Sequence, residues 1–258
     1  MIHLTLLLAI SCVVPTQDSY SGGRITVQPV FCVPRGINEP AAQDSATLIR
    51  QLRISQARYF ELLRGLDTFK LAEKVTIWKC PATIEELKGK PNGAAEFVAS
   101  ELLKKDRKTR WTCPLVYVVL YVGTAAYPRG GGGRPLNGGH DKGGGIVILS
   151  AGDLDSAPNF QSTLQHELGH AFGLPHVDVY GYDMNSNNSL MSYNPGHHTN
   201  FFAPSPTPGQ LIPEDLRALA KNKWVFPAFR FDAAADVPSA YVMQKDVELG
   251  PMELPNPP

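Results

Sequence analysis

Three histidines within residues 166–176 have the spacing of a metal site. The segment reads His-Glu-Leu-Gly-His-Ala-Phe-Gly-Leu-Pro-His. On a helix, His166 and His170 lie about 40° apart in projection, one turn apart, so both can face one ion. Imidazole nitrogen is a preferred zinc ligand, and catalytic zinc sites commonly use three protein ligands. The spacing therefore predicts a zinc site with His166, His170 and His176 as ligands.

The third histidine can join the other two only if the helix ends before it. His176 lies six residues after His170, and a continued helix would turn it about 240° away. Gly173 is suited to end the helix, because glycine adopts the left-handed conformation without penalty. Pro175 then stiffens the returning chain. We therefore expect Gly173 to act as the hinge of the site.

Glu167 is the acid of this segment, and its position favours a role other than ligation. It follows His166 directly and is offset from it by about 100° on a helix. We expect its carboxylate to hydrogen-bond the water in the fourth coordination position. Zinc lowers the pKa of such a water towards 7, and Glu167 can accept its proton and return it to a leaving amine. An open fourth position argues against a structural zinc module, which four protein ligands usually close.

The elements around this segment predict a core that holds it. The helix over Ser156–Phe172 carries the histidines on one side and apolar residues on the other. Alternation predicts a strand over Arg24–Val33, and an unbroken apolar run predicts a doubly buried strand over Leu115–Val122. Further helices are expected over Ala41–Leu66, Ala94–Lys105 and Pro213–Asn222, and further strands within Phe69–Trp78 and over Ile146–Leu149.

A glycine-rich segment separates two of the predicted strands. Gly123–Gly145 contains ten glycines, and ordering so many of them costs much conformational entropy. We therefore expect a loop that packs no core and acts as a lid over the site or is an insertion. Its His140 and Asp141 could face solvent or bind a structural ion.

The histidine segment and a second motif resemble the metzincin clan of zinc metallopeptidases. The clan's pattern is HExxHxxGxxH followed by a methionine turn, and Ser189-Leu190-Met191-Ser192-Tyr193 provides that turn. The resemblance implies that Met191 lies beneath the metal without binding it. It also implies that Tyr193 binds the metal or steadies the oxyanion, as in astacin-like, serralysin-like and pappalysin-like members. Val177, which follows the third histidine, matches no major subfamily, so the subfamily stays open.

The resemblance also implies a fold and its boundaries. We expect an α+β catalytic domain over residues 19–231. Its upper lobe of mixed sheet and helices would run to about residue 173, and a small irregular lower lobe ending in a helix would span 174–231. A loose tail rich in Pro and Ala follows over 232–258. Ile146–Ser150 should lie near the edge strand that pairs with an extended substrate.

Composition and the first residues restrict partners and location. The chain has 258 residues and no net charge, and it lacks a long basic run, which argues against nucleic acid as a partner. Leu4–Val14 is apolar but too short to span a bilayer, so residues 1–18 resemble a signal peptide for export or secretion. Lipidation of Cys12 is the alternative. No later segment is apolar for long enough to cross a membrane, and we expect a monomer.

The remaining cysteines and acids leave alternatives open. If Cys12 is removed with the signal, one disulfide can form among Cys32, Cys80 and Cys113, with one thiol left over. Cys32 could instead be a latency switch, although the matrixin-type PRCG motif is absent. Two further groups leave alternatives as well: Asp178, Asp183, Asn185 and Asn187 could bind calcium or stay solvated, and His197 and His198 could contact substrate or face water.

The sequence as a whole favours an enzyme. We expect a secreted, zinc-dependent endopeptidase with a protein or peptide substrate, in which Glu167 is the general base. The alternative is an extracellular protein that binds zinc but cleaves peptides weakly and acts through binding. The residues do not specify which peptide bond is cut.

Overall fold

A computed structural model describes residues 24–90, 94–123, 131–137, 144–155, 159–186, 188–193 and 209–232. Several sequence expectations lie outside these residues: the signal peptide over 1–18, Cys12, His140, Asp141, Ser156, Asn187, His197, His198 and nearly all of the tail over 232–258.

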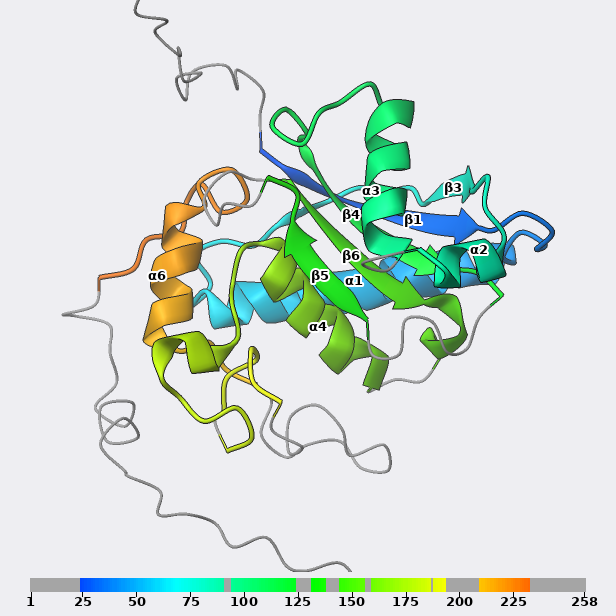
Figure 1. Ribbon diagram of the computed structural model, residues 1–258. Coiled ribbons are helices and arrows are strands. Elements are labelled where there is room, and N and C mark those ends of the chain that lie inside the picture. The colour runs from blue at the N-terminus through cyan, green and yellow to red at the C-terminus, as the bar shows by residue number, and fades with distance from the viewer. Residues whose placement is uncertain are drawn as a thin grey trace, which may run out of the picture.

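A six-stranded mixed sheet forms the centre of the described chain (Figure 1). The strand order is β2-β1-β4-β6-β5, and β3 also pairs with β1. All pairs are parallel except β5 with β6, which is antiparallel. The strands are β1 (Thr26–Val33), β2 (Lys70–Leu71), β3 (Thr76–Lys79), β4 (Leu115–Tyr121), β5 (Gly132–Pro135) and β6 (Gly145–Ser150).

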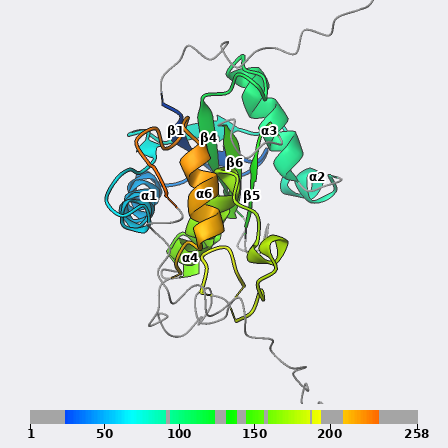
Figure 2. The same cartoon turned by 90° about the vertical axis from the view of Figure 1, so that its left-hand side faces the viewer.

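Helices cover both faces of this sheet, as the end-on view in Figure 2 shows. One face carries α1 (Ala42–Leu62), α4 (Asn159–Ala171) and α6 (Pro213–Lys221) over a core of apolar side chains. The other face carries α2 (Ile84–Lys88) and α3 (Ala94–Lys105) over a second core. Two 3₁₀ turns, η2 (Ala151–Asp153) and η3 (Val177–Tyr180), flank α4 in the chain. The fold is a mixed α/β arrangement of sheet and helices.

The central strands are buried on both faces because they lie between these layers. β4 is buried at every residue after Leu115, and all of β6 is buried. Along β4, Val118 and Leu120 face the core under α1 and α4, while Val119 and Tyr121 face the core under α3. The doubly buried strand predicted from the apolar run is confirmed.

Most predicted elements are confirmed, with small differences at their ends. The helix predicted to reach Leu66 ends at Leu62, because Arg64 and Gly65 both adopt positive φ. The region predicted to contain one strand holds two short ones, β2 and β3. Helix α2 was not predicted; the Thr83 hydroxyl caps it by accepting from the Glu86 N–H, and the Glu86 carboxylate accepts from the Thr83 N–H.

The expectation that residues 123–145 form only a loop is wrong. Within this segment Gly132–Pro135 forms β5, and Leu136 is buried in the core under α3. Glycine carries no side-chain pattern that distinguishes a strand from a loop. The strand exists because its backbone pairs with β6, with Gly133 opposite Val147.

The expected disulfide is not formed either. Cys32, Cys80 and Cys113 are free thiols, all buried on the α3 side of the sheet. Cys32 and Cys80 contact each other, and this contact together with burial raises the pKa of the Cys32 thiol. Cys32 is therefore a core residue beneath α3 and does not join the histidines in a latency switch.

Within the described residues, no helix combines the length and the apolar character that a membrane span requires.

Candidate metal centre

Helix α4 is held against the sheet by its apolar side. Phe160, Leu164 and Leu168 are buried in the same core as α1. A polar contact adds to this packing, because the buried Tyr59 hydroxyl of α1 donates to the carbonyl of Gln165 at 2.9 Å. This packing fixes the orientation of α4, so that the side opposite the core carries His166 and His170.

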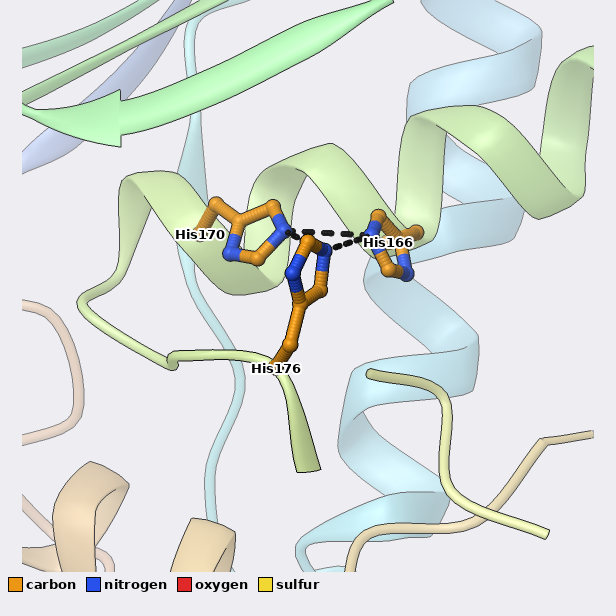
Figure 3. A group of neighbouring side chains, drawn as sticks. All are labelled: His166, His170 and His176. Atoms are coloured by element: carbon orange, nitrogen blue, oxygen red, sulfur yellow. Dashed lines mark hydrogen bonds between the residues drawn. The ribbon is translucent and has the colours of Figure 1, made fainter. Parts of the chain in front are cut away.

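The chain reverses directly after α4. Gly173 has φ of +101°, and the N–H of Leu174 donates back to the carbonyl of Gly169 at 2.9 Å. Beyond the reversal, the N–H of Val177 donates to the carbonyl of Met191 at 3.3 Å. These contacts carry His176 back beneath the end of α4, where its ring faces the other two (Figure 3).

The three imidazole rings converge on one point through their Nε2 atoms. The Nε2 of His166 lies 3.1 Å from that of His170 and 3.3 Å from that of His176, and the last two are 2.9 Å apart. Ligand atoms held about 2.0–2.1 Å from a tetrahedral zinc lie roughly 3.3 Å from one another. Within the described chain, these residues are the only group of three or more His, Cys, Asp or Glu side chains that could hold an ion.

The outer nitrogens show which tautomer faces the centre. The Nδ1 of His166 lies 2.7 Å from the carbonyl oxygen of Leu190, and that of His170 lies 2.7 Å from the carbonyl oxygen of Leu174. A carbonyl only accepts, so each Nδ1 carries the proton and donates. In the neutral rings the Nε2 lone pairs therefore face one another, an arrangement that a cation stabilises. These backbone acceptors also orient the rings, as outer partners of metal ligands commonly do.

Burial favours the neutral form of His170 and His176, as metal ligation requires. It lowers the pKa of His170 to about 4, against a smaller opposing effect of the Leu174 carbonyl. Burial likewise lowers the pKa of His176. Donor type, distances and protonation together fit a zinc ion, which the three histidines could hold by Nε2.

Glu167 lies beside the triad in a desolvated position. Its residue is 9% exposed, and burial raises the pKa of its carboxyl to about 7, while a hydrogen bond from the Gly133 N–H acts in the opposite direction. A carboxyl with a pKa near neutrality can both accept and return a proton. The Gly133 contact comes from β5, the strand that the sequence did not predict.

Met191 lies beneath α4 and is completely buried. It packs against Gly169, where an added Cβ would stand within 3.0 Å of the Met191 sulfur and 3.2 Å from its Cε. Gly169 therefore provides the space that the methionine occupies. The sequence motif contains this glycine, but its role became evident only from the packing.

Tyr193 lies over the histidines and stays open to solvent. Its ring is stacked with His166 at 5.8 Å and meets the ring of His176 edge-on at 4.7 Å. The side chain is 55% exposed. Burial, followed by the charge of Glu167, raises the pKa of its phenol. At neutral pH Tyr193 therefore carries its proton and can donate a hydrogen bond.

The turn that carries Met191 is held by a buried acid from the first turn of α6. Asp215 of α6 accepts from the Ser189 hydroxyl at 3.1 Å and from the Ile212 N–H at 3.3 Å. The Ser189 hydroxyl in turn accepts from the Met191 N–H at 2.9 Å. The same turn presents the Leu190 carbonyl to His166. The spacing of residues in the sequence does not predict a contact such as this one, because Asp215 and Ser189 lie on different segments.

The proposed calcium ligands do not come together as a site. Asp183 uses one carboxylate oxygen to accept from the N–H groups of Asn185 and Ser186, and Asp178 accepts from the Val179 N–H. These are local turn contacts, and calcium stays without support among the described residues.

Comparisons with known proteins give a likeness of fold but not of sequence. No protein-family profile matches the chain, and no curated protein sequence matches it. Wild-type OgpA from Akkermansia muciniphila, in its P 21 21 21 crystal form, is similar to this chain with a TM-score of 0.50 and 16% identity. The alignment covers 85% of this chain and 66% of OgpA.

Two further structures are more distant. Catalytically inactive OgpA in complex with an O-glycopeptide (glycodrosocin) substrate gives a TM-score of 0.47 at 15% identity, covering 78% of this chain and 61% of that one. Metalloproteinase-II from Bacteroides fragilis gives 0.38 at 16%, covering 78% and 54%. The chain thus spans less than two thirds of each of these proteins.

At this identity the likeness concerns the fold alone. The shared fold is a mixed sheet with helices on both faces, and it agrees with the fold expected from the metzincin resemblance.

Proposed function

We propose that the chain is a zinc-dependent endopeptidase that is exported and hydrolyses peptide bonds in proteins or peptides. The observation that carries the proposal is the convergence of three Nε2 atoms within 3.3 Å of one another beside the buried Glu167. Three protein ligands leave a tetrahedral ion with one open position, which distinguishes catalytic from structural zinc.

The chain's own residues supply the proton transfers. Zinc, when bound, activates a water as the nucleophile and polarises the substrate carbonyl. Glu167 accepts the proton from the attacking water and donates it to the leaving amine nitrogen. The neutral phenol of Tyr193 donates a hydrogen bond to the negative charge that develops on the carbonyl oxygen. These steps involve no covalent bond between substrate and protein.

The free edge of β5 supports binding of an extended peptide. β5 pairs with β6 on one side, and no strand within the described residues pairs with its other side. It also lies against α4, where an extended chain could add to the sheet next to Glu167. Pro135, the last residue of β5, has no N–H to offer, so the strand presents a short binding edge.

The test compares three proteins purified from the secreted fraction: wild type, Glu167→Gln and Glu61→Gln. Glu61 lies on α1 with 66% of its side chain exposed, so its variant controls for loss of a carboxylate elsewhere. Each protein is assayed for bound zinc and for cleavage of a library of plain and O-glycosylated peptides, the latter being the substrate type of the OgpA complex. N-terminal sequencing should begin near residue 19 if the signal peptide is removed.

The expected result is about one zinc in every protein, with cleavage by wild type and Glu61→Gln but at least about 1,000-fold slower cleavage by Glu167→Gln. Cleavage by Glu167→Gln at the wild-type rate would contradict the mechanism. Bound zinc without cleavage by any of the three would favour the alternative, a zinc-binding extracellular protein that acts by binding.

A further inference from the structure

Three glycines of the sheet face one side of the active-site helix. Gly131 precedes β5, Gly133 lies within it, and Gly145 begins β6. Their neighbours on α4 are Thr163, Glu167 and Ala171, which are four residues apart and so form one ridge of the helix. We name Gly131, Gly133 and Gly145 the glycine seam.

The seam brings the backbones of strand and helix together. A Cβ added at Gly133 would stand within 3.0 Å of the Glu167 carbonyl oxygen and 2.8 Å from its carbonyl carbon. A Cβ at Gly145 would stand 2.5 Å from the Ala171 carbonyl oxygen. These neighbours are helix backbone and cannot rotate aside as a side chain can. A side chain at Gly133 or Gly145 would therefore displace its strand or α4.

Gly131 extends the same contact and also needs its special backbone. Its φ is +104°, a conformation that other residues rarely adopt. A Cβ there would meet the Thr163 Cγ2 at 3.1 Å and the Glu167 Cγ at 3.2 Å. Gly132 differs, because a Cβ at that position would have no atom within 4 Å. The need for glycine thus alternates along the strand, as side-chain direction does.

Close approach at Gly133 has a chemical result at Glu167. The Gly133 N–H donates a hydrogen bond to the Glu167 carboxylate. The aliphatic part of the same side chain lies against Gly131. Strand β5 and the preceding Gly131 therefore contact Glu167 at its main chain, its methylenes and its carboxylate.

We propose that the glycine seam is a positioning device for the general base: it sets β5 directly on α4 so that the Gly133 N–H holds the Glu167 carboxylate toward the metal centre. This inference rests on the proposed function and assigns a part in it to a segment that carries no reactive side chain. Gly133 is a positioning residue, acting through Glu167. Placement matters because a shift of about 1 Å at a reacting group can cost about 100-fold in rate.

The first test compares Gly133→Ala with Gly132→Ala and Gly145→Ala. Gly133→Ala should lower kcat at least about 10-fold, because it moves the general base, whereas a loss of substrate pairing at the β5 edge would raise KM. Zinc affinity should stay within about 3-fold, because the three histidines are unchanged. Gly132→Ala should keep wild-type stability, because its Cβ would meet no atom within 4 Å. Gly145→Ala should destabilise the fold as Gly133→Ala does but lower kcat less, because its contact lies one turn from Glu167.

The second test needs no change in the seam and reads the contact without an activity assay. Amide exchange is measured in the metal-free protein for wild type, Glu167→Gln and Glu167→Ala. The glutamine retains a carbonyl acceptor, so the Gly133 amide should stay protected. In Glu167→Ala its exchange should accelerate about 10-fold, while the amide of Val119 in the centre of the sheet stays unchanged.

Unaltered Gly133 exchange in Glu167→Ala would overturn the inference, even if Gly133→Ala failed to fold. Equal losses of kcat in Gly133→Ala and Gly145→Ala would overturn it as well, since the seam would then serve packing alone. Failure of the proposed function is distinct: wild type would then cleave no peptide, while the amide exchange would still report on the contact.

Discussion

Helix α4 and strand β5 lie against each other at the metal centre, yet they contribute by opposite means. The helix contributes side chains: two imidazoles, one carboxylate and an apolar side buried under α1. The strand contributes backbone. Gly131 and Gly133 allow contact with α4 because they have no side chains, and the Gly133 N–H reaches Glu167.

Helix α4 and strand β5 tolerate substitutions differently. A side chain on α4 can be removed with loss of its one function, because the helix is held by other residues. A side chain added to Gly133 affects the whole contact, because helix backbone occupies the space. The difference leads to a rule for this centre: the helix should be sensitive to what is deleted, and the strand to what is added.

Deleting a metal ligand from α4 should have the largest effect. His170→Ala should weaken zinc binding by more than about 100-fold, since loss of even an outer-shell partner costs about 10- to 100-fold. Metal competition with a chromophoric chelator measures this. His140→Ala is the matched control, because His140 lies outside the histidine motif of residues 166–176. Loss of zinc from His140→Ala would show a second site in the glycine-rich segment.

The same difference decides what the sequence could predict. The ligands and the doubly buried β4 follow from side-chain types and spacing, and the reversal after α4 follows from Gly173 and the need to return His176. Strand β5 was missed because GGRP carries no alternation; only its pairing with β6 makes it a strand.

Tertiary contacts account for the other omissions. Asp215 accepts a local hydrogen bond at the start of α6 and a distant one from Ser189, and the distant contact has no signal in the spacing of the sequence. The expectation of a disulfide was wrong for a related reason, since the number of cysteines does not show that all three thiols are buried in one core. Spacing identifies residues on one element, whereas contacts between elements need the fold.

The turn beneath the centre combines side chain and backbone, and its pH response tests that combination. Burial raises the pKa of Asp215 from an ordinary 3.8 to about 7, opposed by the hydrogen bonds from Ser189 and Ile212; the charge of Glu214 adds a further small increase. Tyr59, Tyr180 and Tyr182 are further titratable groups near enough for the Asp215 charge to raise their pKa values. Between about pH 4 and 7, Asp215 is therefore protonated more often in the native state than in the unfolded chain.

Asp215 should consequently reduce stability as the pH rises. The stabilising contribution of protonated Asp215 to the free energy of unfolding is fully present below about pH 4. It is lost as the pH rises through about 7, and the loss is at most roughly 4 kcal/mol. Asp215→Asn stays neutral and keeps a carbonyl acceptor, so it should become more stable than wild type above pH 7. Urea unfolding at pH 4.5, 6 and 8 measures the difference. Asp183→Asn is the control with the opposite sign, because hydrogen bonds lower the pKa of that exposed carboxylate. A constant difference across the range would show that Asp215 is charged throughout.

Adding a methyl group to α4 tests whether the helix is also sensitive to addition where backbone or core approaches it. Gly169→Ala would force the new Cβ against the Met191 sulfur, with the Tyr59 hydroxyl 3.3 Å away. We expect a loss of about 1–3 kcal/mol in unfolding free energy, as for other overpacked cores. Gly89→Ala, where the nearest atom would be 3.5 Å away, should change stability by less than about 0.5 kcal/mol. If both variants match wild type, Met191 can repack freely, and the support assigned to it is not specific.

The smallest effect should come from a hydroxyl at the exposed rim of the centre. Tyr193→Phe keeps the ring against His166 and His176 and removes only the donor. We expect kcat to fall about 10-fold, or about 1.4 kcal/mol, because a half-exposed donor to the oxyanion competes with water. Zinc content and stability should be unchanged, since the Tyr193 backbone still donates to Met184. Tyr182→Phe, whose hydroxyl contacts Glu214, controls for loss of a phenol. A fall in zinc affinity with unchanged kcat would mean that Tyr193 acts as a metal ligand, and the centre would then depend on four side chains.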